Sequence, residues 1–522
     1  MIERGAQTLR PSRAGGWDGP ALALGLGLFW LLRLDALPLL DIDEGAFAGA
    51  SAQLLASGDW GHTTLDGVDR FDKPILVYWL QAAALAIVGP GEVGARLPSA
   101  VCAWLWCLAL AGFAAPRWGR GVAWAAALLL ATALGPALIG RAATADALLN
   151  LLLTLAGLDL WRHLESGASA PLRRAAIWVG LGLLAKGPIA LLVPGATLLI
   201  WAAAERRFAP LRKALGDLPA WLLFFAVSLP WYAYALARHG WAFVDGFLIR
   251  HNLARFGGPL EGHGGSLVYY LIALPLLLLP WTPLLIPALR HARRMIDDPL
   301  RRFLLAWTGF VLVFFSLSGT KLPHYVLYGV TPLVLLAARG LPLAGERTIG
   351  AIAVLGIGMV AVGPTSALLA DVITSRLADP FWRLLLEMDE LAAPPSWPIA
   401  AAVAVVIMML GIARGAGSMV RVIAICLLAI GYTTQQTLPW WGRALGDPVR
   451  ELALVARSMA EPVVQWRVHH PSLGFYSGRP APRREPRAGE LAVVRADRLD
   501  AGELAALQVL ARRRVYLLVR LP

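Results

Sequence analysis

Long apolar runs recur at short intervals along most of this chain. A transmembrane helix needs about 20 mainly apolar residues, so each run predicts one span. Lys186-Gly187-Pro188 predicts a tight turn between two of the shorter runs. The pattern therefore predicts a mainly α-helical, polytopic membrane protein. Its spans, about 13 in all, are expected at residues 21–40, 96–115, 121–139, 144–161, 174–186, 188–204, 218–237, 267–289, 303–318, 323–338, 349–370, 397–413 and 418–434.

Two segments depart from this pattern. Residues 41–94 are too polar to span a membrane, but small and apolar residues at helical spacing predict interfacial helices in this first outer loop. Residues 440–522 mix helical and strand-like patterns. We therefore divide the chain into a transmembrane domain, 1–439, and a small α/β domain, 440–522. In the second domain we expect helices at 448–459 and 501–511 and strands at 463–468, 491–496 and 515–521.

Charge follows the alternation of the apolar runs. Hydrophobic residues make up 58% of the chain, charged residues 16%, and the formal net charge is +13. A basic soluble protein suggests a nucleic-acid partner. Here Lys and Arg gather in every second loop instead, which is typical of cytoplasmic loops, so we expect no nucleic acid. With an odd number of spans, this rule places the N-terminus in the cytoplasm and both the first outer loop and the C-terminus outside.

The first outer loop opens with three acids in four residues, Asp41, Asp43 and Glu44. They precede a predicted helix, where the helix dipole stabilises carboxylates, so they can be capping residues. A carboxylate at the lipid–water boundary can instead act as a base or orient a nucleophile. The pattern alone leaves both interpretations open.

The same loop ends with Arg70, Asp72, Lys73 and Pro74. Pro74 suits the first turn of a helix, and the aromatic residues after it suit a membrane interface. Arg70 and Lys73 can also meet a phosphate group near the membrane surface. Helix start and phosphate site are both compatible with these residues.

Later outer loops carry further polar residues. Arg141 and Asp146 form either a simple ion pair or, through Asp146, a second carboxylate in the same cavity. Lys321 and Tyr325 either face that cavity or simply reach the membrane interface. The bias of Lys and Arg towards cytoplasmic loops would place positive charges on the other side of the membrane. Their presence here therefore favours an outer-face cavity with two carboxylates, several cations and aromatic walls.

A glycine-rich loop after the seventh run brings His251, Arg255, Glu261 and His263 near the same surface. A solvated loop explains each of these residues taken alone. Glu261 and His263 could bind a metal, but two ligands are weak evidence for a metal site.

Ten short motifs occur in an order that resembles one family. The chain is similar to the membrane glycosyltransferases of GT-C type, above all to the group of the lipid A 4-amino-4-deoxy-L-arabinose transferase, and more distantly to protein O-mannosyltransferases. The resemblance extends nearly unbroken to residue 330. The motifs are Asp43-Glu44 with Ala48, then 55–60, 71–79, 95–100, 186–188, 229–231, 255–256, 263–270, 279–281 and 314–325.

The resemblance implies a GT-C fold in the bacterial inner membrane. It also implies transfer of a sugar from a polyprenyl-phosphate donor to an acceptor at the periplasmic face. That acceptor would be a lipid A-like glycolipid, another envelope glycan or a protein. No cofactor is required by this reading, although a divalent metal could take part.

The resemblance also implies roles for individual residues. Catalytic positions fall on Asp43, its neighbour Glu44, and Asp146. The pair Asp72 and His263 can hold a metal, although metal dependence is not implied. The expected partners of the donor phosphate are Lys73, Arg70, Arg255, Lys321 and Tyr325.

The chain departs from the group at two places. Ala46 and Phe47 stand where the group has Arg and Tyr, and Arg250-His251-Asn252 replaces the usual Arg-Glu-His. One phosphate-binding charge is therefore missing or supplied elsewhere, with Arg70 and His251 as the candidates.

Two other classes of function compete with an enzyme. A transporter or flippase of lipid-linked sugars should carry its ionisable residues near the middle of the membrane. Here they gather at one face, which favours an enzyme. A scaffold protein with a degenerate site is the third alternative, because of Ala46 and Phe47.

Overall fold

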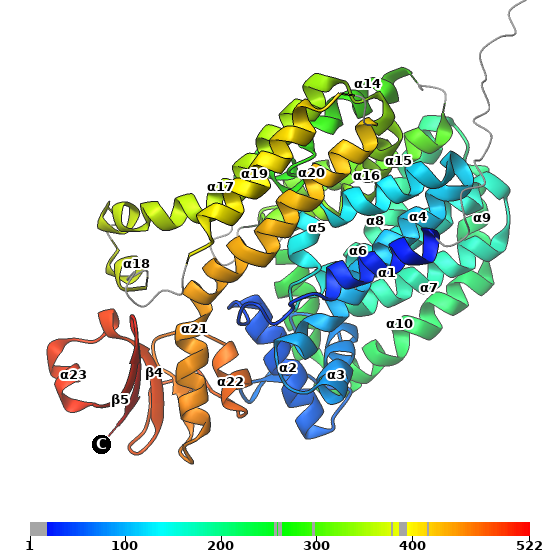
Figure 1. Cartoon of the computed structure of the whole chain (residues 1–522). Coiled ribbons are helices and arrows are strands. Elements are labelled where there is room, and N and C mark those ends of the chain that lie inside the picture. The colour runs from blue at the N-terminus through cyan, green and yellow to red at the C-terminus, as the bar shows by residue number, and fades with distance from the viewer. Residues whose placement is uncertain are drawn as a thin grey trace, which may run out of the picture.

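The computed structural model describes residues 18–254, 258, 264–294, 298–376, 379–385, 394–414 and 417–521. Figure 1 shows a bundle of helices with a small β-sheet at one end, beside the C-terminus. The α-helices of the bundle are α1 (Asp18–Leu31), α4 (Glu92–Ala131), α5 (Leu134–Ile139), α6 (Asp146–Ser166), α7 (Ser169–Lys186), α8 (Ile189–Glu205), α9 (Ala209–Gly216), α10 (Leu218–His239), α11 (Trp241–Phe243), α13 (Tyr269–Leu277), α14 (Leu285–Arg294), α15 (Pro299–Leu317), α16 (Val330–Gly340), α17 (Glu346–Arg376), α19 (Trp397–Ile412), α20 (Ser418–Tyr432) and α21 (Leu438–Arg457). The short helix α18 (Pro380–Leu385) lies outside the bundle, where Phe381 contacts Tyr516 of the sheet.

Short helical segments of other types join several of these helices. Two are π-helical, η1 (Val244–Leu253) and η6 (Thr433–Thr437). Three are 3-10 segments, η2 (Thr282–Leu284), η3 (Pro323–Gly329) and η4 (Leu341–Leu343). Segment η3 continues directly into α16, so the two cross the bundle together.

Among the described residues, six helices are long and apolar enough to cross a membrane. A seventh span would come from the bent pair Tyr269–Leu277 and Thr282–Arg290, whose axes meet at 111°. The predicted multi-pass architecture is confirmed at this level, and the number of 13 spans stays a prediction. The six helices are Glu92–Ala131, Leu218–His239, Pro299–Leu317, Pro323–Leu343, Glu346–Leu369 and Ser418–Arg457.

Every predicted apolar run contains a helix, but several boundaries differ, and the run 267–289 is broken into α13 and α14. Helix α1 ends at Leu31, well before residue 40, and turns follow it. Element α4 contains one predicted run and most of the next, but it consists of two helices that meet at a kink, because Gly119 has non-helical backbone angles. Gly119 has φ 83°, a left-handed conformation that glycine adopts without steric cost.

The first outer loop forms α2 (Asp43–Ser57) and α3 (Leu76–Val88), as the sequence predicts. Between them, the short strands β1 (Thr64–Leu65) and β2 (Val68–Asp69) form an antiparallel hairpin with a two-residue turn. Asp66 and Gly67 have positive φ values of 54° and 83° at its turn, which is the usual Asp-Gly signal for such a hairpin. The hairpin brings the segment that begins at Arg70 back towards α2.

Residues 463–520 form a four-stranded sheet. In the strand order β3-β4-β6-β5, β3 runs parallel to β4 and the other neighbours are antiparallel. The helix predicted over 501–511 is wrong in its second half, because residues 508–513 pair with the last strand as an edge strand. The elements are β3 (Val463–Gln465), α22 (Ser472–Ser477), β4 (Leu491–Arg495), the 3-10 segment η7 (Ala496–Arg498), α23 (Ala501–Ala506), β5 (Gln508–Arg513) and β6 (Tyr516–Arg520).

The sheet packs against both α21 and the first outer loop. Its face with Val463, Leu491 and Leu518 shares an apolar cluster with Leu452 of α21 and Ala48 of α2. Helix α22 lies between α21 and α2 (Figure 1). The C-terminal segment is therefore held beside the first outer loop, where the predicted site residues are concentrated.

Candidate active site

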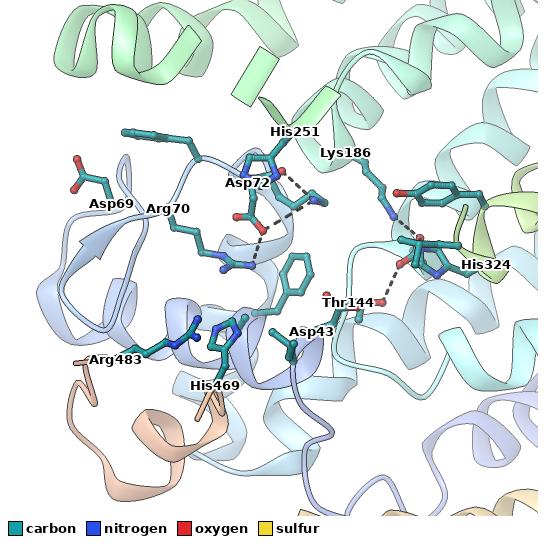
Figure 2. Close-up of a pocket in the computed structure, with 18 residues that line it drawn as sticks. Asp43, Asp69, Arg70, Asp72, Thr144, Lys186, His251, His324, His469 and Arg483 are labelled. Atoms are coloured by element: carbon teal, nitrogen blue, oxygen red, sulfur yellow. Dashed lines mark hydrogen bonds and ion pairs between the residues drawn. The ribbon is translucent and has the colours of Figure 1, made fainter. Parts of the chain in front are cut away.

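A polar cavity of about 860 Å³ opens between the first outer loop, α6, α7, η3 and the C-terminal segment. Figure 2 shows side chains from all of these elements pointing into one space. Six residues predicted for the site line this cavity, namely Asp43, Arg70, Asp72, Lys73, Asp146 and Tyr325. The structure thus brings together positions that span nearly 300 residues of sequence.

An ion pair between Lys186 and Asp146 forms one wall of the cavity. Lys186 Nζ lies 2.5 Å from Asp146 Oδ1, and Tyr328 donates a hydrogen bond of 3.0 Å to the same oxygen. Asp146 begins α6 and Lys186 ends α7, so two consecutive helices bring the residues together. Gly187 then makes the predicted turn with φ 86°, where a Cβ would lie 2.7 Å from the Phe247 ring.

The opposite wall carries Arg70, Asp72 and Lys73. Arg70 Nη2 lies 2.6 Å from Asp72 Oδ2, and Lys73 Nζ lies 4.0 Å from the same atom. Burial alone would raise the pKa of Asp72, but the charges of Arg70 and Lys73 outweigh it and hold that pKa below its ordinary value. The Arg70 guanidinium also lies 5.7 Å from the centre of the Phe47 ring. Arg70 therefore supplies a cation beside Phe47, one of the two residues at which this part of the chain departs from the group.

Asp43 and Glu44 have different surroundings although they are neighbours. Asp43 is exposed to the cavity, and it makes no hydrogen bond or ion pair with the rest of the described chain. Glu44 is buried, receives two hydrogen bonds from Arg96 of 2.8 and 2.7 Å, and accepts others from the N–H groups of Leu40 and Ala143. Its carboxylate therefore fixes α2 in place, and only Asp43 presents a carboxylate to the cavity.

The sequence predicts Lys321 as a cation of the cavity, but in the structure Lys186 faces the cavity and Lys321 does not. Lys321 is not part of the cavity wall, because its ammonium donates hydrogen bonds of 2.8 and 2.7 Å to the carbonyls of Ser316 and Ser318. It closes the end of α15 instead. The ammonium of Lys186 faces the cavity and lies 5.6 Å from the centre of the Tyr325 ring.

The predicted residues Arg255 and His263 lie outside the described residues. In the part of the chain that is described, no group of three or more His, Cys, Asp and Glu side chains could hold a metal ion. Oxygen Oδ2 of Asp72 faces the cations of Arg70 and Lys73, so it already has positive partners. The metal pair Asp72 and His263 stays a prediction, and no chemical step below depends on it.

Two less polar pockets, each of about 460 Å³, adjoin the polar cavity on different sides. The first has walls such as Leu192, Leu248 and Phe314 and shares Lys73 and Lys186 with the cavity. We call it the lysine-side pocket. The second has walls such as Leu138, Leu438 and Leu445 and shares five residues with the cavity. We call it the aspartate-side pocket, and the shared residues are Ile42, Asp43, Thr144, Asp146 and His324.

Asp41 connects the C-terminal segment to α2. It accepts hydrogen bonds from the Ser472 backbone N–H, at 2.9 Å, and from the Ser472 hydroxyl, and it lies 3.2 Å from His470 Nδ1. Asp41 is therefore neither a helix cap nor a solvated acid. His469, which precedes His470, and Arg483 of the same segment lie at the cavity wall (Figure 2).

A second carboxylate, Asp66 of the hairpin, joins the same two regions. It accepts hydrogen bonds from the Ala481 N–H, at 2.9 Å, and from Gln465 Nε2, at 3.0 Å. Burial raises the pKa of Asp66 to about 6 despite these two donors. Burial and the nearby Arg483 hold the pKa of His469 below its usual value. The contact between the hairpin and the C-terminal segment therefore contains a carboxyl group that titrates at about pH 6.

Five Lys, Arg and His side chains of the cavity were not assigned a role from sequence. Lys186 had a signal, since it is a cation in a turn on the outer side, where topology predicts few. His251 was considered only as a substitute charge. The others were missed because nothing local distinguishes them from solvated residues, and only the fold brings them to the cavity. The five are Lys186, His251, His324, His469 and Arg483.

Comparisons with known proteins point to one group. The family model described as dolichyl-phosphate-mannose-protein mannosyltransferase matches residues 72–234. The undecaprenyl phosphate-alpha-4-amino-4-deoxy-L-arabinose arabinosyl transferase of Pseudomonas aeruginosa strain UCBPP-PA14 is 31% identical over 385 residues, which cover 71% of this chain and 68% of that protein. The protein of the same name from Pseudomonas paraeruginosa is 32% identical over 375 residues, covering 69% and 66%. The matched region thus spans about two thirds of these relatives.

A solved structure has the same fold as this chain. The crystal structure of ArnT from Cupriavidus metallidurans bound to undecaprenyl phosphate superposes with a TM-score of 0.80, covering 97% of this chain and 98% of that one at 21% identity. The predicted mainly helical fold class is confirmed by this likeness.

Proposed function

Because the chain belongs to the family of undecaprenyl phosphate-α-4-amino-4-deoxy-L-arabinose arabinosyl transferases, as its motifs predicted, we propose that it transfers a sugar from a polyprenyl-phosphate donor to an acceptor in the bacterial cell envelope. The acceptor is a lipid A-like glycolipid, another envelope glycan or a protein. One observation carries this proposal: a polar cavity with an exposed carboxylate, Asp43, adjoins an apolar pocket lined with lysines.

The lysine-side pocket suits the lipid part of the donor. Its apolar walls can take the first units of a prenyl chain, while Lys73 and Lys186 lie where that pocket meets the polar cavity. A phosphate at this junction would have two ammonium groups, the Tyr325 hydroxyl and the His251 ring within the same walls. Cations of this kind bind phosphate strongly.

The polar cavity suits the transfer step. When the bond between the sugar and the phosphate breaks, negative charge accumulates on the leaving phosphate, and Lys73 and Lys186 stabilise it. Asp43 accepts a hydrogen bond from the acceptor and so orients the attacking atom. The same carboxylate faces the positive charge that develops on the sugar. Asp146 keeps Lys186 in position through the 2.5 Å contact.

The aspartate-side pocket suits the acceptor. It reaches the cavity at Asp43 and Asp146, away from the lysines that line the donor pocket. Its walls are largely apolar, so a lipid-anchored acceptor fits better than a soluble one. Two substrates can then meet at Asp43 from opposite sides.

The proposed location is the inner membrane, with about 13 spans, the N-terminus in the cytoplasm and the C-terminus in the periplasm. The alternation of basic loops supports this orientation. Under it, residues 440–522 form a small periplasmic α/β domain, and the cavity opens near the periplasmic surface. Asp43 and its neighbours then act outside the cytoplasm, where a lipid-linked donor is the available source of activated sugar.

Mass spectrometry of lipid A and of other envelope glycans, from cells with and without this chain, tests the proposal. We expect one glycan to lose a sugar when the chain is absent and to regain it when the chain is restored. A chain with Asp43→Asn is the matched control, because it keeps the fold and removes only the charge. An unchanged glycan profile in all three strains contradicts the proposal.

A further inference from the structure

Arg141 is a cation of the aspartate-side pocket to which no role has been assigned so far. It lies in the turn between α5 and α6, and it lines this pocket but not the polar cavity. An ion pair between Arg141 and Asp146 was one of the two alternatives that the sequence left open. In the structure Asp146 pairs with Lys186 instead, so Arg141 has to be explained separately.

The packing of this turn fixes the place of the guanidinium. A Cβ on Gly140 would lie 2.3 Å from the Trp30 ring, so glycine is what lets the turn approach α1 this closely. The Arg141 guanidinium then lies 4.5 Å from the centre of the Phe29 ring and 5.0 Å from that of Trp30. It also donates a hydrogen bond to the Phe29 carbonyl. The side chain is therefore held against the last turns of α1.

The guanidinium of Arg141 has no carboxylate partner in the described chain. Its Nε and Nη1 are buried, and neither has a hydrogen-bond partner among the described residues. Burial lowers the pKa of Arg141 to about 10, so the group stays charged at neutral pH. Arg96 lines the same pocket, but it pairs with Glu44 at 2.7 Å. Since a buried cation without a counter-ion is destabilising, Arg141 is set up to bind an anion from outside the described chain.

A second guanidinium lies in the same pocket. Arg33 follows α1, is exposed, and donates a hydrogen bond of 3.0 Å to the carbonyl of Gln435. No described acid forms an ion pair with Arg33. Three of the four acids that line the pocket have partners of their own, and Asp43 is the fourth. The partnered acids are Asp41 with Ser472, Glu44 with Arg96, and Asp146 with Lys186.

The pocket is suited to an anionic lipid. Its other walls, such as Leu138, Leu438 and Leu445, are apolar and fit hydrocarbon. A guanidinium in such surroundings binds phosphate or carboxylate through strong, charge-assisted hydrogen bonds. We propose that Arg141 is a specificity-determining residue that binds an acidic group of the acceptor lipid, with Arg33 as a second cation in the same pocket. The inference rests on the proposed function, which places the acceptor here.

The group bound by Arg141 is an anchor and not the reacting group. Arg141 does not line the polar cavity, where Asp43 and the lysines are placed for transfer. It therefore holds one part of the acceptor head while another part of the same molecule reaches Asp43. A neutral acceptor of the same shape would leave the buried guanidinium without an anion, and a site of this kind rejects such an analogue.

The test measures binding in the absence of a donor. Purified full-length protein in neutral detergent micelles is titrated with lipid A, with dephosphorylated lipid A and with phosphatidylglycerol, and its tryptophan fluorescence is followed. We expect the wild-type protein to bind lipid A at least about tenfold more tightly than the dephosphorylated form. Arg141→Gln should bring this ratio close to one, whereas Arg141→Lys, which keeps the charge, should retain part of it.

Arg238→Gln is the matched control. It removes a cation that lines neither the polar cavity nor either pocket, so it should keep the full ratio. The unfolding temperature of each variant shows that it is folded. A merely structural role of Arg141 would weaken the binding of both forms of lipid A alike, and would leave their ratio unchanged.

The possible failures are distinguishable. Equal binding of the two forms of lipid A by the wild-type protein, or an unchanged ratio in folded Arg141→Gln, overturns the role of Arg141. If phosphatidylglycerol binds as tightly as lipid A and depends equally on Arg141, the residue holds a phospholipid of the bilayer, and its role in acceptor choice is overturned. If lipid A binds as expected but the wild-type protein transfers no sugar from a polyprenyl-phosphate donor to any envelope lipid, the anion site stands and the proposed function fails.

Discussion

The Lys186 ammonium lies 2.5 Å from the Asp146 carboxylate, although 40 positions separate the two residues in sequence. Both side chains are nearly buried, with exposed fractions of 12% and 8%. Lys186 lines the lysine-side pocket and Asp146 lines the aspartate-side pocket, so the pair stands between the two proposed substrates. The first prediction concerns this pair.

Lys186→Ala is expected to reduce both stability and transfer. Breaking a buried ion pair by removing one partner costs about 3–5 kcal/mol, since the remaining carboxylate is left without its cation. Transfer should fall further, because the donor phosphate also loses a cation. Thermal unfolding and sugar-transfer assays measure the two effects. The double variant Lys186→Ala/Asp146→Asn should regain stability but not activity, and recovery of both would contradict a role for Lys186 at the phosphate.

Glu44→Gln is expected to destabilise the protein without removing any group that reaches the cavity. Arg96 donates to Glu44 and to the carbonyls of Leu34, Leu37 and Pro38, so loss of the Glu44 charge loosens the entry to α2. The expected loss is again about 3–5 kcal/mol. Glu165→Gln is the matched control, because Glu165 keeps 48% of its side chain exposed and its pair with Arg117 should therefore matter less. Equal unfolding temperatures for the two variants would contradict this reading of Glu44.

Asp41→Ala is expected to loosen the C-terminal segment. It removes the acceptor for both Ser472 donors and the partner of His470. Limited proteolysis should then cut between α21 and β4 faster than in the wild-type protein. Transfer should fall, because His469 and Arg483 would no longer be held at the cavity. Unchanged cleavage rates would show that the apolar contact with α2 alone is sufficient.

The contact made by Asp66 should depend on pH. Its pKa is about 6 in the folded protein, above the ordinary value of 3.8, so the folded state binds the proton more tightly than the unfolded state. The stabilisation is complete below pH 3.8 and is lost as pH rises through about 6. Unfolding free energy measured from pH 4 to pH 7 should therefore decline more steeply in the wild-type protein than in Asp66→Asn. Parallel curves would refute the assignment.

Local sequence patterns predict the helices well. Apolar runs have one physical cause, burial in lipid or in the bundle, and a helix forms in each of them. The Lys186 turn is also local, since Gly187 alone allows its backbone conformation. The strand at 508–513 could not be read in this way. Gln508–Arg513 has no strong alternation, and it becomes a strand because Tyr516–Arg520 offers it an edge.

The site depends on contacts that no local pattern records. Asp43 and Lys73, both singled out by the motif order, line one cavity, but the motifs did not separate Lys321, which binds its own helix end, from Lys186, which faces the cavity. His469 reaches the cavity through long-range contacts of its segment, one of which joins Asp41, over 400 residues earlier, to His470 and Ser472. Such pairings are fixed by how the helices pack, and a single sequence does not show them.

The central claim is that Asp43 serves sugar transfer from a polyprenyl-phosphate donor. Its most direct test uses wild-type protein and Asp43→Asn, both reconstituted in liposomes with a radiolabelled polyprenyl-phosphate sugar and an envelope lipid acceptor. The wild-type protein is expected to move label to the acceptor. Asp43→Asn, with the same expression, unfolding temperature and donor binding, is expected to move none. Full transfer by Asp43→Asn would contradict the account.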